Sequence, residues 1–117
     1  MSYMLKERAL SEDTRVVTVG GELDMGAAPE LRGAISRALE AGASTLMVDL
    51  SEATFIDSTT IGVLVATHQR LGLAGGSLEI VCCEPNLLRV FEVVGINREL
   101  SIHATWDAAL GAFAGTR

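Results

Sequence analysis

The sequence predicts an α/β fold: one small domain over residues 1–117, with a mixed, mostly parallel β-sheet and about four helices. Strand-like and helix-like segments alternate along most of the chain, which is typical of parallel strands joined by crossover helices. Residues 45–50 are almost continuously apolar, as a central strand buried on both faces requires. The 117 residues also have the length of a single domain, and no linker or repeat divides them.

The first third of the chain is expected to form a hairpin and then a helix. Residues 3–9 and 14–19 have the pattern of strands, with a polar loop between them, and the pair of glycines that follows is expected to end the second strand. Pro29 suits the first turn of a helix, because an N–H has no intrahelical partner there. An apolar stripe with helical spacing follows, and Gly42 is the expected C-terminal stop.

The rest of the chain alternates between the two kinds of element. We expect a strand at 45–50, a helix that begins near 58, a strand at 77–82, a helix from Pro85 that Gly95 closes, a strand at 100–103 and a helix at 106–113. The predicted order is therefore β-β-α-β-α-β-α-β-α. The opening hairpin makes the predicted sheet mixed, because the later strands are joined by helices and run parallel.

Charge and composition exclude several functional classes. The formal net charge is −6 and the arginines are scattered singly, whereas binding to a nucleic-acid backbone needs clustered Lys and Arg. No apolar run reaches the ~18 residues of a membrane span, and residues 1–6 lack the features of a signal peptide. We therefore expect a cytoplasmic protein that binds neither nucleic acid nor membrane.

The cysteines and histidines indicate no metal site and no catalytic site. Cys82 and Cys83 are neighbours, and adjacent strand residues point to opposite faces, so we expect neither a disulfide between them nor a zinc site. The chain has no Gly-x-Ser-x-Gly motif. A pairing of Ser58 with His68 or His103 has little support, because a histidine on a helix face is more often a surface or packed residue. We expect no enzyme activity, no cofactor and no metal.

Residues 57–60, Asp-Ser-Thr-Thr, are the strongest functional signal in the sequence. They lie between the strand at 45–50 and the next helix, where crossover-sheet proteins place functional loops. One polar residue is enough to cap a helix, and Ser58 is expected to do so through its hydroxyl. Thr59 and Thr60 are poor helix formers that capping does not explain. The Ser58 hydroxyl is also expected to reach solvent beside free backbone N–H groups, which favour phosphate.

A second polar segment, Gly-Gly-Glu-Leu-Asp at 20–24, precedes the first helix. Two interpretations of Asp24 remain open. It either prepares the N-terminus of that helix, where acidic side chains are favoured, or it contacts a partner beside the carboxyl end of a parallel strand.

Six segments carry a resemblance to a known family. They are Gly-Gly-Glu-Leu-Asp at 20–24, Val-Asp-Leu-Ser at 48–51, Phe-Ile-Asp-Ser-Thr at 55–59, Ile-Gly at 61–62, Gly-Gly-Ser-Leu at 75–78, and Arg-Val-Phe at 89–91 with Gly95. Together they resemble the STAS-domain family, and more narrowly the bacterial anti-sigma factor antagonists. The resemblance extends over essentially the whole chain and implies the STAS fold.

The resemblance also implies a binding protein that phosphorylation switches. In the family, the serine directly after the aspartate is phosphorylated by a serine kinase that is also the anti-sigma factor. That residue is Ser58 here, ahead of Thr59 and Thr60. The unphosphorylated protein binds the kinase and frees the sigma factor, and a serine phosphatase restores that form. The implied partner-binding residues are Asp24, Asp57, Ser58, Thr59, Thr60 and Gly62.

The chain departs from the family pattern at Thr60, where the family usually has Gly. We favour a Thr60 that faces the partner, because a β-branched residue brings no helical advantage at this position. The alternative is that Thr60 supports the start of the helix through its own hydroxyl. The alternative function is a STAS module without a phosphorylation switch. Such a module is either a constitutive regulatory subunit or a small-ligand sensor that uses the same strand-end cleft.

Overall fold

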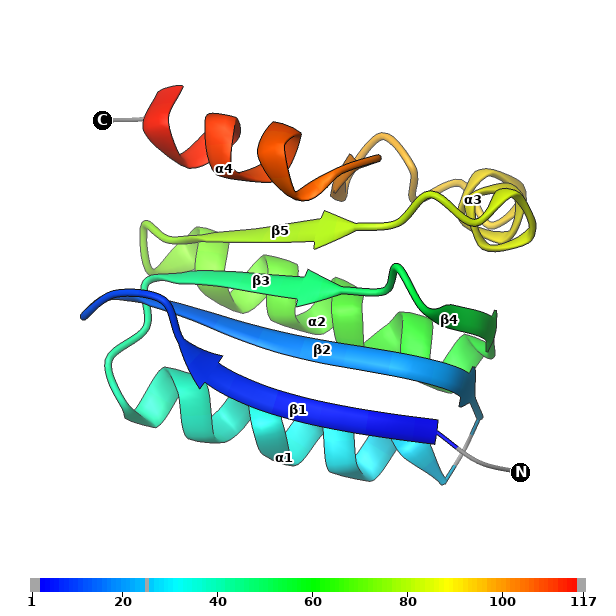
Figure 1. Ribbon diagram of the computed structural model, residues 1–117, viewed down its shortest axis with the longest axis horizontal. Coiled ribbons are helices and arrows are strands. Elements are labelled where there is room, and N and C mark those ends of the chain that lie inside the picture. The colour runs from blue at the N-terminus through cyan, green and yellow to red at the C-terminus, as the bar shows by residue number, and fades with distance from the viewer. Residues whose placement is uncertain (1–2, 25, 116–117) are drawn as a thin grey trace.

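A six-stranded mixed β-sheet forms the centre of the protein (Figure 1). The computed structural model describes residues 3–24 and 26–115, and side chains as far as residue 112. Its elements are β1 (Tyr3–Ala9), β2 (Thr14–Leu23), α1 (Ala27–Glu40), β3 (Thr45–Asp49), β4 (Ala53–Ile56), α2 (Ser58–Leu73), β5 (Ser77–Val81), α3 (Pro85–Val93), β6 (Ser101–His103) and α4 (Trp106–Gly115). The strand order is β1-β2-β3-β5-β6, and β4 also pairs with β2. Of these pairs only β1–β2 is antiparallel, which confirms the predicted mixed, mostly parallel sheet.

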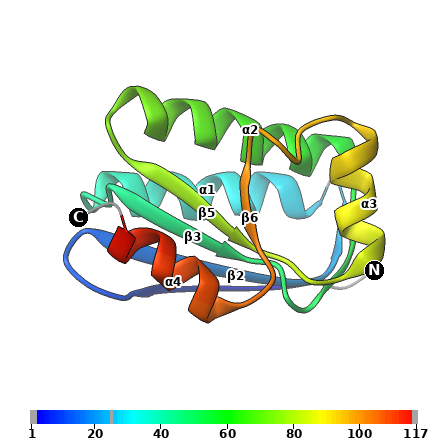
Figure 2. The same cartoon turned by 90° about the horizontal axis from the view of Figure 1, so that it is seen from above.

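Helices cover both faces of the sheet (Figure 2). The main core lies between the sheet and α1, α2 and α3, and contains the fully buried Leu31, Leu64 and Phe91. A smaller core lies on the opposite face, where Val16, Met47 and Val81 contact Ala109 and Trp106 of α4. Alternate residues of β3 therefore face different cores. This two-sided burial is the physical reason for the continuous apolar run in the sequence.

β2 is longer than the sequence predicts, because it continues through Gly20 and Gly21 to Leu23. Gly21 has a φ of 84°, a conformation that costs little for glycine alone. The pairing of β2 with β4 shifts register between Gly21 and Glu22, as at a β-bulge. The irregular backbone lets the strand continue past the glycines, so the expectation that they end it is wrong.

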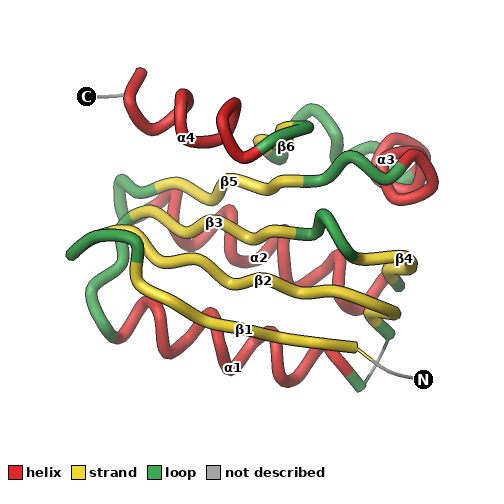
Figure 3. The backbone as a smooth tube through the Cα atoms, in the orientation of Figure 1, coloured by secondary structure: helices red, strands yellow, loops and turns green. Residues whose placement is uncertain are grey.

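The sequence does not predict β4. This four-residue strand lies beyond the end of β3 and beside the last residues of β2 (Figure 3). It pairs Phe55 with Glu22 and Ile56 with Leu23. α1 also begins at Ala27, slightly earlier than expected. The consequence of β4 is positional, since it brings the start of α2 next to the carboxyl end of β2.

The two cysteines follow β5 and differ in exposure. Cys82 is buried, Cys83 is exposed and both are free thiols. Burial raises the pKa of the Cys82 thiol above its ordinary value. Within the described ranges no helix has both the length and the apolar character to cross a membrane. The same residues contain no group of three His, Cys, Asp or Glu side chains placed to hold a metal ion.

Candidate functional site

Asp57, and not Ser58, caps the N-terminus of α2. Its backbone is extended, with φ −101° and ψ 174°, and its carboxylate accepts a hydrogen bond from the Thr60 N–H at 2.9 Å. Its own N–H donates to the Leu23 carbonyl oxygen at 3.0 Å, and its carbonyl oxygen accepts from the Ile61 N–H. The expectation that Ser58 caps the helix is therefore wrong. A carboxylate occupies that position, where the positive end of the helix dipole stabilises it.

Ser58 is the first residue of α2, and its side chain is exposed. Its hydroxyl has no hydrogen-bond partner among the residues that the structure describes. Thr59 is exposed beside it, and Gly62 is exposed one turn further along the helix. A Cβ at Gly62 would meet nothing within 4 Å, so internal packing does not require glycine there. The surface of α2 around Ser58 is therefore exposed, and it is low at Gly62 because glycine has no side chain.

Thr60 is fully buried, with 0% of its surface exposed. Its hydroxyl donates to the Leu23 carbonyl oxygen at 3.2 Å and so joins α2 to the end of β2. That carbonyl also accepts the Asp57 N–H, and the junction is therefore held by two hydrogen bonds to one oxygen. The expectation that Thr60 faces a partner is wrong, because neither a partner nor a kinase reaches this side chain.

Replacing Thr60 by Gly is expected to lower the free energy of unfolding by about 2 kcal/mol. The change removes a buried hydrogen bond, leaves a small void and adds the helix cost of glycine. Urea unfolding measures the loss, and Thr59→Gly is the matched control because it changes the same residue type at an exposed position. Equal losses in both variants would show that the Thr60 hydroxyl does not support the junction.

Asp24 lies directly after β2 and organises the start of α1. Its carboxylate accepts the Gly26 N–H at 3.0 Å, and its carbonyl oxygen accepts the N–H groups of Ala27 and Ala28 at 3.0 and 3.3 Å. Asp24 and Asp57 each follow by one residue the paired Leu23 and Ile56, so the two acids lie at neighbouring strand ends. The structure thus supports the helix-start interpretation of Asp24 and leaves its side chain half-buried.

Phe55 is an exposed aromatic residue two positions before Asp57, and sequence reasoning assigned it no role. Its exposed fraction is 49%, whereas the next residue, Ile56, is buried. Along β4 the two end residues, Ala53 and Ile56, are buried, and the two middle ones, Thr54 and Phe55, are exposed. The signal was absent from the sequence only because β4 itself was not predicted. Phe55 adds an apolar element to the surface that carries Ser58.

Neither histidine lies at the start of α2, where Ser58 is. His68 is half-buried on α2, and His103 on β6 contacts Glu79 through its Nε2 at 2.7 Å. Ser101 also contacts that Nε2, at 3.1 Å, and donates a short hydrogen bond to Glu79. A hydrolase relay needs the acid and the serine on opposite ring nitrogens, so this arrangement is a structural cluster that holds β6 against β5.

Comparison with known proteins gives a consistent picture. The model of the STAS domain matches residues 6–109. The anti-sigma-B factor antagonist of Bacillus subtilis is 33% identical over 94 residues, which cover 80% of this chain and 85% of that protein. The anti-sigma-B factor antagonist of Staphylococcus aureus is 32% identical over 80 residues, covering 68% of this chain and 74% of that protein.

Solved structures of similar proteins agree with the sequence matches. An anti-sigma factor antagonist from Mycobacterium paratuberculosis superposes with a TM-score of 0.85 at 30% identity, over 95% of this chain and 93% of that one. The anti-sigma factor antagonist SpoIIAA in its unphosphorylated form gives 0.82 at 23% identity, over 96% and 97% of the two chains. Its phosphorylated form gives 0.74 at 22% identity, over 94% and 99%. These last two likenesses concern the fold.

Proposed function

Because this chain belongs to the STAS-domain family, we propose that it is an anti-sigma factor antagonist switched by phosphorylation of Ser58. Unphosphorylated, it binds and sequesters an anti-sigma factor that is also a serine kinase, and so frees a sigma factor for transcription. The kinase phosphorylates Ser58, the complex dissociates, and a serine phosphatase restores the binding form. The protein acts by binding and not by catalysis, and its place of action is the cytoplasm.

The observation that carries this proposal is the placement of Ser58. Its hydroxyl is exposed and free of hydrogen bonds to the described residues, and it lies at the first position of a helix whose cap is a different residue. A kinase can therefore phosphorylate the Ser58 hydroxyl without breaking a hydrogen bond that stabilises the fold. Thr60 is buried and is excluded as an acceptor, which leaves Thr59 as the neighbouring alternative.

The family relatives support the choice of partner. The proteins named anti-sigma-B factor antagonists match over most of their own length as well as most of this chain. A protein with this fold has been solved in phosphorylated and unphosphorylated forms. The exposed Phe55, the low surface at Gly62 and the acids Asp24 and Asp57 surround Ser58 with the mixture of apolar and polar groups that protein interfaces use.

The test is phosphorylation in vitro by each serine-kinase anti-sigma factor of the source genome, with ATP, read by intact mass and peptide mapping. We expect a single phosphate on Ser58. Ser58→Ala should accept none and should stay bound to the kinase in the presence of ATP, while Thr59→Ala should still be modified. Label on Thr59 with Ser58 unmodified would overturn the assignment. Stable binding without any phosphate transfer would instead identify a constitutive regulatory subunit.

A further inference from the structure

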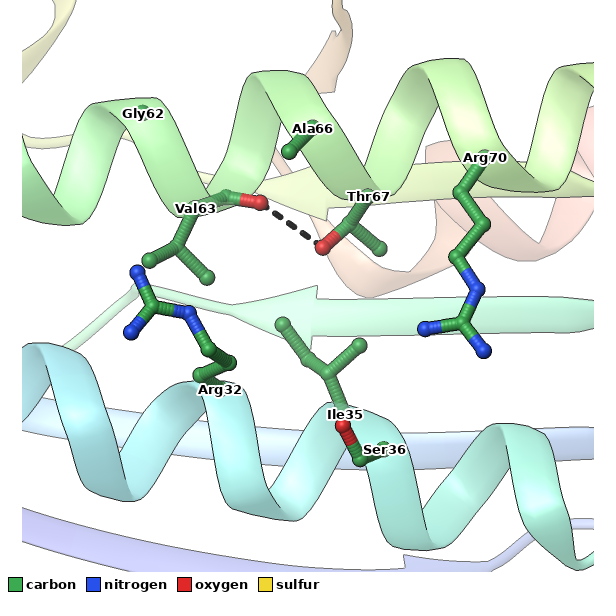
Figure 4. Close-up of a pocket in the computed structure, with 8 residues that line it drawn as sticks. All are labelled: Arg32, Ile35, Ser36, Gly62, Val63, Ala66, Thr67 and Arg70. Carbon is green, nitrogen blue, oxygen red and sulfur yellow. Dashed lines mark hydrogen bonds between the residues drawn. The ribbon is translucent and has the colours of Figure 1, made fainter.

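A groove of about 200 Å³ runs between α1 and α2, on the face of the sheet opposite α4 (Figure 4). Ile35 of α1 and Val63 and Ala66 of α2 give it an apolar lining. Thr67 also lines it, but its hydroxyl donates to the Val63 carbonyl oxygen at 2.7 Å and is thus already satisfied. The volume lies below the ~300–1,000 Å³ of typical small-molecule pockets, so the groove suits a few side chains of a protein partner.

Two arginines flank this groove without a partner. Arg32 of α1 and Arg70 of α2 both extend into the space between the helices (Figure 4). Neither forms an ion pair with any residue that the structure describes, and no acidic residue lines the groove. Arg37, by contrast, is paired with Glu7 at 2.6 Å, although it lies on the same helix as Arg32. In a chain with a net charge of −6, this groove is a local site of positive charge.

The groove continues the surface that carries Ser58. Gly62 lines the groove and lies one helical turn after Ser58 on α2. Arg32 lies level with Val63 in Figure 4, and Arg70 follows Val63 by seven residues. Seven residues of helix span about 10 Å along the axis. Arg32 and Arg70 therefore start about two helical turns apart along the groove, a spacing that carboxylates on another helix can match.

We propose that this groove docks an acidic helix of the partner that binds at Ser58, with its carboxylates paired to Arg32 and Arg70 and its small apolar side chains against Ile35 and Val63. This inference rests on the proposed function and adds the chemistry of the partner's contact. Arginine suits the role because its planar guanidinium pairs with a carboxylate through two hydrogen bonds. An acidic partner surface beside Ser58 also gives a reason for phosphate to repel the partner.

The experiment measures affinity for the kinase that phosphorylates Ser58, in the absence of ATP, by titration calorimetry. Arg32→Glu and Arg70→Glu are each expected to weaken binding on the order of tenfold, and Arg32→Gln and Arg70→Gln by less. The charge reversals should also flatten the dependence of affinity on salt, since the paired charges then repel. Lys6→Glu is the matched control, because it makes the same charge change on an exposed residue of β1; it should stay within twofold of wild type.

Two further measurements separate this inference from the proposed function. Circular dichroism melting checks that each exposed arginine variant remains folded, and replacement of the partner's facing Glu or Asp by Lys should restore its binding to the charge-reversed variants. Wild-type affinity in Arg32→Glu and Arg70→Glu, with the phosphorylated form still released, would overturn the proposed docking of an acidic helix in the groove. The phosphorylation switch at Ser58 would remain supported. A wild-type chain that binds no such kinase would overturn both.

Discussion

Phosphorylation of Ser58 is expected to weaken binding of the kinase by roughly 5- to 5,000-fold while the protein stays folded. The phosphate adds about −1.5 to −2 charges at neutral pH. If the kinase carries a negative charge about 6 Å from a doubly charged phosphate, the repulsion weakens binding by roughly 1–5 kcal/mol, for effective dielectric constants from ~80 down to ~20. Asp57 already lies beside Ser58, so the added charge accumulates at one edge of the proposed interface.

The fold should tolerate this charge. The Ser58 hydroxyl makes no hydrogen bond to the described residues, and the cap is supplied by Asp57, so neither phosphorylation nor Ser58→Asp removes a stabilising contact. A negative charge in the first turn of a helix is favoured by about 0.3–1 kcal/mol, which offsets its repulsion from Asp57. We therefore expect Ser58→Asp to change the free energy of unfolding by under about 1 kcal/mol.

Binding and melting measured on the same samples decide the point. Ser58→Asp should bind the kinase several-fold more weakly than wild type, since it carries about half the charge of the phosphate. Ser44→Asp is the charge-matched control, because Ser44 is exposed at the amino end of β3, whereas Ser58 follows the carboxyl ends of β2 and β4. Undiminished binding of the phosphorylated protein, or a marked loss of thermal stability in Ser58→Asp, would contradict an electrostatic switch.

The largest effect on stability is expected from Gly76→Ala, a loss of about 3 kcal/mol. A Cβ at this position would lie 2.1 Å from the Ser44 carbonyl oxygen and 3.3 Å from a Leu71 methyl carbon. The carbonyl cannot move freely, because it accepts the Ser77 N–H at 2.9 Å next to the pairing of Thr45 with Ser77. The clash must therefore displace the start of β5 relative to β3.

Gly72→Ala provides the matched control and is expected to have the opposite sign. Gly72 is inside α2, and a Cβ at this position would meet nothing within 4 Å, so alanine should stabilise the helix by up to about 1 kcal/mol. Differential scanning calorimetry should show a melting temperature lower by about 10 °C for Gly76→Ala and slightly higher for Gly72→Ala. Similar melting temperatures for the two variants would mean that β5 does not begin against β3 as described.

Local patterns determined the class of the fold. Alternating periods of two and 3.6 residues predicted the strands and helices, and Pro85 and Gly95 correctly delimited α3 and its closing turn. The run of apolar residues at 45–50 correctly predicted a strand buried on both faces. These features depend on short stretches of chain and on the steric properties of single residues, so they are visible without knowing what lies nearby.

β4 could not be predicted from local patterns. Its four residues are too few to show a period, and it pairs with the end of β2, some thirty residues earlier in the chain. The glycines at 20–21 have the local signature of a stop, but the register shift there lets β2 continue. Pairing between distant segments therefore decided where β2 ends and where the site lies.

The sequence by itself placed Ser58 at the start of a helix beside a strand end, and it identified the polar cluster around it. Only the tertiary structure divided the roles within that cluster. Pairing of β4 with β2 holds Asp57 in the extended conformation of a cap. The Ser58 hydroxyl is then bonded to none of the described residues, and Thr60 turns inward to the Leu23 carbonyl oxygen. Ser, Thr and Asp all cap helices well enough that propensity does not choose between them. The choice came from a backbone hydrogen bond between residues 23 and 57, a contact that no local pattern records.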